Sequence, residues 1–280
     1  MKNQTPTPGA SLMQFSSGKI ISTCIAAVLL LTSGSLQAVN VTKLDTTSMA
    51  SSVVNWSAAP AVADIGQFTA TPSSGTLAAL TLGGANLTLG GLQFDGTLNG
   101  PATILAGNTL TIGTASANCI NASAANQNIA INCGLTLITG ANTWNVASSR
   151  TLTVGGALTV GSGTTITFAG GGNYAIGGYN SGNGTGGALI TTTGTFTSSG
   201  GLTIQKGGSS TTTVPTASVP VSPSTGTGFY VNGGNSVFLN SLSLNTGNGG
   251  LQSRIDSGSV MITNQLLIGQ IGRASCRERV

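Results

Sequence analysis

Leu110-Thr111-Ile112, Leu135-Thr136-Leu137 and Leu158-Thr159-Val160 are three copies of one short pattern, evenly placed along the chain. Further copies stand at Leu87-Thr88-Leu89, Leu202-Thr203-Ile204 and Leu242-Ser243-Leu244. The intervals before the last two copies are nearly twice as long as the others, and we interpret each of them as two repeats. A fixed period of about 22–25 residues is typical of stacked repeat architectures.

Apolar residues alternate with Thr, Ser or Asn in short runs, such as Leu152-Thr153-Val154, and each run ends at Gly or Asn. Period-two patterning between turn residues predicts β-strands, and three such strands fit into one repeat. No stretch after residue 38 carries an apolar stripe at helical spacing. We therefore predict an all-β fold, a single-stranded right-handed parallel β-helix with a period of about 22–25 residues.

In this fold Leu, Ile and Val stack inside the coils, and Thr and Asn point outward. The length predicts about ten coils. An antiparallel sandwich also has short strands and Gly-rich turns, but it does not explain the constant recurrence of Leu-Thr.

The N-terminus predicts an export signal. Lys2 and Lys19 precede the mainly apolar run 20–31, and Leu36-Gln37-Ala38 follows. This pattern predicts a signal peptide over residues 1–38 with cleavage after Ala38. A membrane anchor is the alternative, but the run is shorter than the roughly 20 residues that span a bilayer.

The C-terminal end, from Ile271 to Val280, concentrates charge in a chain that otherwise avoids it. It matches one reading frame of a common short-read sequencing adapter. We therefore predict that residues 270–280 are an adapter-derived junction and tail, that the codon of Gln270 is CAG, and that residues 39–269 are a truncated passenger-like β-helical domain. A genuine basic tail is the alternative, and it would suggest a nucleic-acid or membrane patch.

The segment between the two ends is electrically balanced. Its charged residues are Lys43, Arg150, Lys206 and Arg254 against Asp45, Asp64, Asp95 and Asp256. Nucleic-acid binding needs a concentrated basic surface, so we predict no nucleic-acid partner.

Two cysteines, Cys119 and Cys133, lie in this segment. A lone pair in an exported chain predicts a disulfide, and two unlinked thiols on neighbouring turns are the alternative.

Three stretches interrupt the repeat. Residues 49–72 hold Trp56 and Phe68 and are predicted to cap the first coil, because repeat arrays need capped ends. Residues 170–187 are rich in Gly and Asn and predict turns or a protruding loop. Residues 207–228 are rich in Ser, Thr and Pro and predict an insertion.

Several of these motifs resemble those of the autotransporter-associated β-strand repeat proteins, which are exported bacterial proteins with passenger-like β-helices. The resemblance rests on Asn55-Trp56, on Leu80-Thr81-Leu82-Gly83-Gly84, on Leu92-Gln93-Phe94-Asp95-Gly96 and on the run from Asn142 to Gly156. It covers residues 54–206. It implies export through the inner membrane, a place at the cell surface, in the outer membrane or outside the cell, and a membrane contact only through a missing C-terminal barrel or anchor.

The sequence offers little for catalysis. It has no His, which removes the commonest general base. Neither Asp64 nor Asp95 sits in an acid-rich cluster, and Asp95 in Phe94-Asp95-Gly96 suits a turn. We therefore predict no catalytic residues and no enzyme.

We also predict no cofactor and no metal. Calcium-binding solenoid repeats carry Asp in each Gly-rich turn, whereas these turns carry Asn and Ser. The stretch 182–187 faintly resembles a phosphate-binding loop, but a β-rich run follows it where a helix is needed. The aromatic residues suit either core packing or a sugar-stacking platform; they are Trp56, Trp144, Tyr174, Tyr179 and Tyr230.

The predicted function is therefore that of a non-enzymatic structural or adhesive protein with surface glycans or other surface proteins as partners. A carbohydrate-active lyase or hydrolase, with its active site in missing sequence, is the alternative from another class. A surface-layer spacer is a third.

Overall fold

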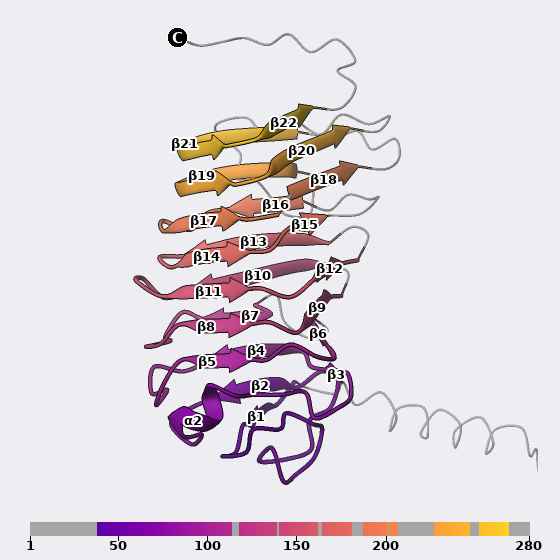
Figure 1. Cartoon of the computed structure of the whole chain (residues 1–280), viewed down its shortest axis with the longest axis vertical. Helices are drawn as coiled ribbons and strands as arrows, with labels where there is room; N and C mark the ends of the chain where they lie inside the picture. Colours follow the sequence, from indigo (N-terminus) through magenta and orange to yellow (C-terminus); the bar gives the residue numbers. More distant parts are fainter. Residues whose placement is uncertain are drawn as a thin grey trace, which may run out of the picture. The chain divides into compact units, whose positions relative to one another are not determined.

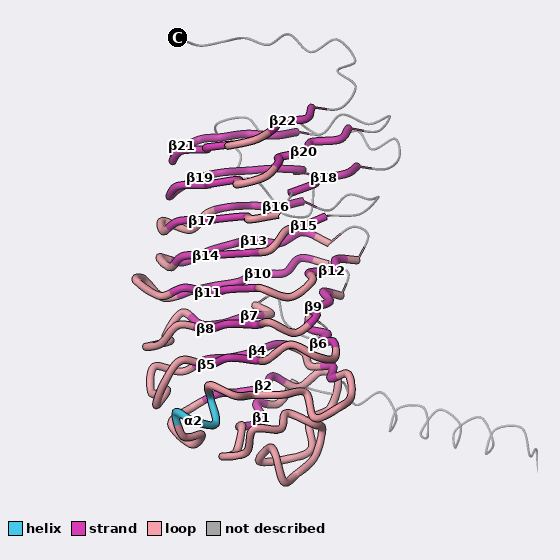
Figure 2. The backbone as a smooth tube through the Cα atoms, viewed as in Figure 1, coloured by secondary structure: helices cyan, strands magenta, loops and turns pink. Residues whose placement is uncertain are grey.

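The computed structural model describes residues 38–113, 118–138, 140–161, 164–180, 187–200, 202–206, 227–246 and 252–268. Over these residues the chain forms a parallel β-solenoid of about seven turns, with one short helix, α2 (Ser74–Leu77) (Figure 1). The coils wind in the right-handed sense (Figure 1), and the pairing between named strands is parallel throughout. Figure 2 shows the strands of successive coils stacked above one another and joined by loops. The predicted parallel β-helix is confirmed, and the sandwich is wrong.

Each coil contributes strands to three faces. Face 1 holds β1 (Asn40–Thr42), β2 (Ile65–Phe68), β4 (Gly91–Phe94), β7 (Ile120–Ala122), β10 (Ala141–Val146), β13 (Thr165–Gly170) and β16 (Gly187–Ile190). Face 2 holds β5 (Ala102–Ile104), β8 (Ile129–Ile131), β11 (Thr151–Val154), β14 (Asn173–Ile176) and β17 (Thr195–Ser198). The long strands β19 (Thr227–Phe238) and β21 (Gln252–Ile262) continue both faces.

Face 3 is built from two ladders. One comprises β3 (Leu87–Thr88), β6 (Thr109–Ile112), β9 (Gly134–Leu137) and β12 (Leu158–Val160). The other comprises β15 (Tyr179–Asn180), β18 (Leu202–Lys206), β20 (Ser241–Thr246) and β22 (Gln265–Ile268).

The recurring tripeptides all lie on face 3 and pair in register. Leu110 pairs with Leu135, and Leu135 pairs with Leu158. Equivalent residues overlie one another because parallel stacking repeats each position once per coil. The sequence period is therefore the coil period.

The interval between the last two tripeptides is one coil and not two, which corrects our interpretation. Leu202 on β18 pairs directly with Leu242 on β20. The additional chain falls between Lys206 and Thr227, where the insertion is predicted. This longer coil, together with the loops at the N-terminal end, reduces the number of coils from the expected ten to about seven.

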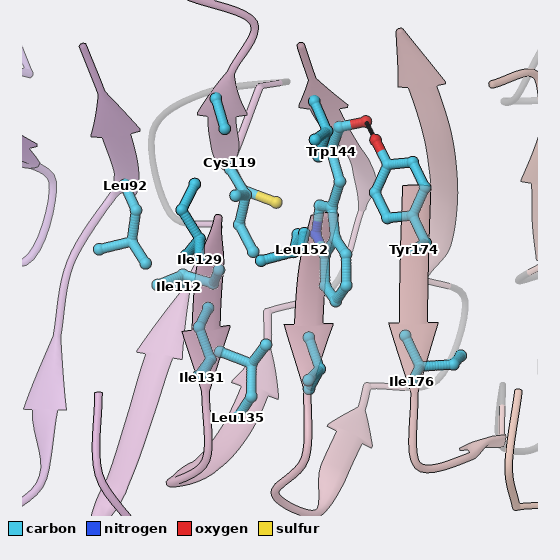
Figure 3. Packing of buried hydrophobic residues seen from close by; sticks show 14 of the residues in the cluster. Leu92, Ile112, Cys119, Ile129, Ile131, Leu135, Trp144, Leu152, Tyr174 and Ile176 are labelled. Carbon is cyan, nitrogen blue, oxygen red and sulfur yellow. Dashed lines mark hydrogen bonds between the residues drawn. The ribbon is translucent and has the colours of Figure 1, made fainter. Parts of the chain in front are cut away.

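The interior is a continuous apolar column, as predicted, with aromatic rings in it as well as aliphatic side chains (Figure 3). Phe68 stacks on Phe94 with ring centroids 4.8 Å apart. Higher in the stack, Phe168 packs against Trp144 and Phe196 at 5.3 and 4.7 Å. Each fully buried side chain of this size contributes about 1.5–3 kcal/mol.

Residues 170–180 belong to a regular coil, which corrects the N-terminal part of the predicted loop. The strands β14 and β15 occupy most of this stretch. The glycines serve the tight turn before β14, where Gly170 has φ +88° and a Cβ on Gly172 would collide with Val146 of the coil below. Gly and Asn therefore mark a close approach between coils here.

Residues 43–64 form loops at the N-terminal end of the stack (Figure 1). Trp56 is fully buried, packs edge-on against Phe68 at 5.9 Å, and donates from Nε1 to the Met49 carbonyl at 3.1 Å. Phe68 belongs to β2 and so to the coils themselves. The loop contributes its own apolar groups to the end of the column.

Cys119 and Cys133 are buried free thiols, in place of the predicted disulfide. Cys119 precedes β7 on face 1, and its Sγ lies beside Trp144, 3.9 Å from the Thr143 carbonyl of the next coil (Figure 3). Cys133 precedes β9 on face 3. The two residues lie at different corners of one coil, because the strand β8 of face 2 lies between them in the sequence.

The other predicted segments lie outside the described residues. These are residues 1–37 of the signal, residues 207–226 of the insertion, and residues 269–280 with the tail.

Candidate binding surface

A row of amide side chains runs up the outside of face 1. Gln67, Gln93, Asn121 and Asn145 are successive register partners on β2, β4, β7 and β10. Each is half-buried, and each stands next to a buried inward residue such as Phe68 or Trp144. We refer to these four residues as the amide row. Period-two alternation places them outside, and the register aligns them.

Asp95 organises the N-terminal end of the amide row. Its Oδ2 accepts a hydrogen bond from Gln67 Nε2 at 2.8 Å, and its Oδ1 accepts one from Gln93 Nε2 at 3.0 Å. Gln93 Oε1 accepts in turn from Asn40 Nδ2 at 3.4 Å. Asp95 reaches this position because it follows β4 directly and because its backbone N–H donates a hydrogen bond to the Phe68 carbonyl at 3.0 Å. One carboxylate thus fixes the orientation of two amides on neighbouring coils.

A second row occupies the outside of face 3. Thr88, Thr111, Thr136 and Thr159 are consecutive register partners on β3, β6, β9 and β12. We call them the threonine row. They are the polar members of the tripeptides, and their side chains are half-buried or exposed.

Both rows present groups that donate and accept hydrogen bonds without net charge. An amide offers two donors and one acceptor oxygen, and a hydroxyl offers both functions. The spacing within a row is the distance between neighbouring strands, about 4.8 Å. The arrangement therefore suits repeated weak polar contacts to an extended, uncharged partner.

Asp64 and Asp95 do not form a catalytic pair. Asp64 stands before β2, where its oxygens accept from the backbone N–H groups of Val39 and Ala61 at 3.1 and 2.7 Å. Asp95 lies after β4, at the other end of the same strand pair, so five residue steps, roughly 16 Å along the strands, separate the two positions. The two catalytic carboxylates of glycosidases are about 5 to 9.5 Å apart.

Among the described residues, no group of three or more His, Cys, Asp or Glu side chains is placed to hold a metal ion.

The aromatic side chains lie inside the solenoid where the structure describes them. Trp56, Trp144, Tyr174 and Tyr179 are buried, and the side chain of Tyr230 lies outside the described residues. The Tyr174 hydroxyl donates to the carbonyls of Trp144 and Ala169, at 2.7 and 2.6 Å, and burial raises its pKa. The predicted role in core packing is confirmed for these four residues.

Residues 182–186, which faintly resemble a phosphate-binding loop, lie outside the described residues. The strand β16 follows them, where a phosphate-binding loop would need a helix.

The sequence pattern did not point to a set of asparagines at the coil corners. The side-chain oxygens of Asn86, Asn128 and Asn173 each accept the backbone N–H of a threonine one coil later, at 2.9, 3.0 and 2.8 Å. The available signal was an Asn immediately before, or at, the first residue of a strand. These bonds fix the turn that orients each following strand.

Comparison with protein families, with curated proteins and with solved structures finds no match to the chain. Within the described residues, no helix is long and apolar enough to cross a bilayer.

Proposed function

We propose that this chain is an exported bacterial surface or secreted protein, similar to an autotransporter passenger, whose β-solenoid acts as a structural and adhesive stalk. The observation that supports this proposal most is that the amide row and the threonine row repeat at the coil spacing on two faces of one solenoid. A pre-ordered surface loses little conformational entropy when it binds, so many weak contacts can add up. Cell-surface glycans and other surface proteins are the proposed partners.

Export and localisation are tested by expressing the chain from residue 1 in a Gram-negative host and separating the cell fractions. N-terminal sequencing of the exported product is expected to begin at Val39. Retention in the cytoplasm with an intact N-terminus would contradict the export proposal.

Adhesion is tested by probing a glycan array and bacterial cells with the labelled chain. We expect binding that falls when Gln93 and Asn121 are both replaced by Ala, and that is retained in the matched variant Thr103→Ala on face 2. A chain that shortens polysaccharides would instead favour the carbohydrate-active alternative, and a folded chain that binds neither would favour the spacer.

A further inference from the structure

A lysine is buried at the N-terminal end of the solenoid without a carboxylate partner. The side chain of Lys43 is fully buried, and its Nζ donates to the carbonyls of Leu44 and Thr46, at 3.0 and 2.6 Å, and to that of Asn55 at 3.2 Å. Asp45, the carboxylate nearest in sequence, bonds instead to Ser73 and Thr76. A lysine is rarely buried this deeply unless it is paired.

The hydroxyl of Thr46 connects this amine to the side chain of Asn55. Thr46 Oγ1 accepts from Lys43 Nζ at 2.8 Å and lies 3.1 Å from Asn55 Oδ1, to which it donates. Asn55 is itself buried, and its Nδ2 donates to the Ala50 carbonyl at 3.1 Å. The amine of Lys43, the hydroxyl of Thr46 and the carboxamide of Asn55 are therefore consecutive members of one hydrogen-bonded chain.

The backbone fixes this arrangement. Lys43 and Trp56 form an antiparallel bridge, and the Leu44 N–H donates to the Asn55 carbonyl at 2.9 Å. The indole of Trp56 covers the amine, with Nζ 5.7 Å from the ring centroid. Water is excluded from one side of the site, which favours amide formation over hydrolysis.

We propose that Lys43 and Asn55 join spontaneously in an isopeptide bond. The deprotonated Nζ attacks Cγ of Asn55, and the hydroxyl of Thr46 stabilises the charge that develops on Oδ1. The bond from Cγ to Nδ2 then breaks, and Nδ2 leaves as ammonia with the proton that Nζ gives up. The products are one amide cross-link and one ammonia molecule, with no oxidant or cofactor required.

The chemical state of the amine supports this step. Burial lowers the pKa of Lys43 from 10.5 to about 8, and the charge of Asp45 offsets a part of that effect. An uncharged fraction is therefore present near neutral pH, and an uncharged amine is the nucleophilic form.

The cross-link would close the loop between β1 and Trp56 covalently. Solenoids contact only their neighbouring coils, so the terminal coil is where unfolding begins most easily. A covalent bond at this end suits a stalk under load, but the proposal does not depend on adhesion.

The test is a denaturing intact-mass measurement of the purified chain followed by peptide mapping. We expect a mass reduced by one ammonia molecule, no tryptic cleavage after Lys43, and a single tryptic peptide ending at Arg150 in which an internal loop joins Lys43 to Asn55. The variants Lys43→Met and Asn55→Ala are expected to show their full calculated masses, whereas Asn40→Ala, an exposed control, keeps the loss. Thr46→Val is expected to slow the reaction.

Two results would overturn the proposal. One is a full mass in the wild-type chain, with tryptic cleavage after Lys43. The other is an ammonia loss that persists in Lys43→Met, since an asparagine that cyclises to a succinimide loses the same mass. If a variant fails to fold, the peptide map of the wild-type chain alone shows whether Lys43 and Asn55 are joined.

Discussion

Leu202 and Leu242 are direct partners on adjacent coils, although more chain separates them than separates Leu110 from its partner Leu135. The stack therefore accommodates almost one coil's length of additional chain between two in-register strands. Loop closure entropy rises only slowly with loop length, so such an insertion costs little.

Deleting residues 207–224 is expected to leave the solenoid folded. The deletion gives Leu202 and Leu242 the same sequence spacing as Tyr174 and Phe196, which pair on adjacent coils. Circular dichroism should retain its β spectrum, and the thermal midpoint should stay within a few degrees. Loss of the β signal would contradict the pairing of β18 with β20. Deleting residues 164–180, which removes strands of a described coil, is the control that should destabilise the chain.

Phe168→Ala is expected to destabilise the middle of the stack by about 3–5 kcal/mol, because it empties a position between Trp144 and Phe196. Thr167→Ala, its outward neighbour, should change the free energy of unfolding by less than about 0.5 kcal/mol. Urea denaturation followed by tryptophan fluorescence compares the two, since Trp144 packs on Phe168. Equal effects would place Phe168 outside the core.

The thiol of Cys119 is expected to resist alkylation in the native chain. Burial raises its pKa to about 12, so almost no thiolate forms at pH 8. Burial also raises the pKa of Cys133. Maleimide should label neither cysteine in the native chain. It should label both Cys119 and Cys133 once the chain is denatured in the absence of a reductant. If the denatured chain carries no label on either cysteine until it is reduced, the disulfide exists after all.

The last described coil is expected to make the chain prone to association. Ile255, Met261 and Leu266 are 55, 52 and 50% exposed there, and clustered exposed apolar side chains promote association. Size-exclusion chromatography should show oligomers or aggregates. Met261→Lys with Leu266→Glu should shift the chain toward monomer. A monodisperse wild-type monomer would contradict this expectation.

The sequence predicted the coil architecture because Leu110, Leu135 and Leu158 carry its period directly. It did not predict the single coil from Leu202 to Leu242, since the interval between these two residues divides equally well into two repeats. It misjudged residues 170–180 because Gly and Asn serve tight corners between coils as well as loops. It predicted a disulfide from a lone cysteine pair in an exported chain, and the compartment does not show on which face a cysteine lies.

The polar surface was predicted only in outline. The alternation of apolar and polar residues predicted that Gln93 and Asn121 lie on the outer surface. Their alignment in one row depends on the strand register, which the sequence does not reveal because the coils differ in length. The connection of Lys43 through Thr46 to Asn55 depends on a local antiparallel bridge, and no periodic signal indicates that bridge.

Equivalent residues of successive coils lie directly above one another, and pairs of engineered cysteines can check this register. Thr111→Cys with Thr136→Cys places two thiols on paired positions, whose Cα separation of about 4.8 Å permits a disulfide. Thr88→Cys with Thr136→Cys places them two coils apart, beyond the limit of about 7 Å. After mild oxidation, peptide mass spectrometry should find the bridge in the first variant and not in the second. A bridge in the second variant alone, or in neither, would contradict the coil stack.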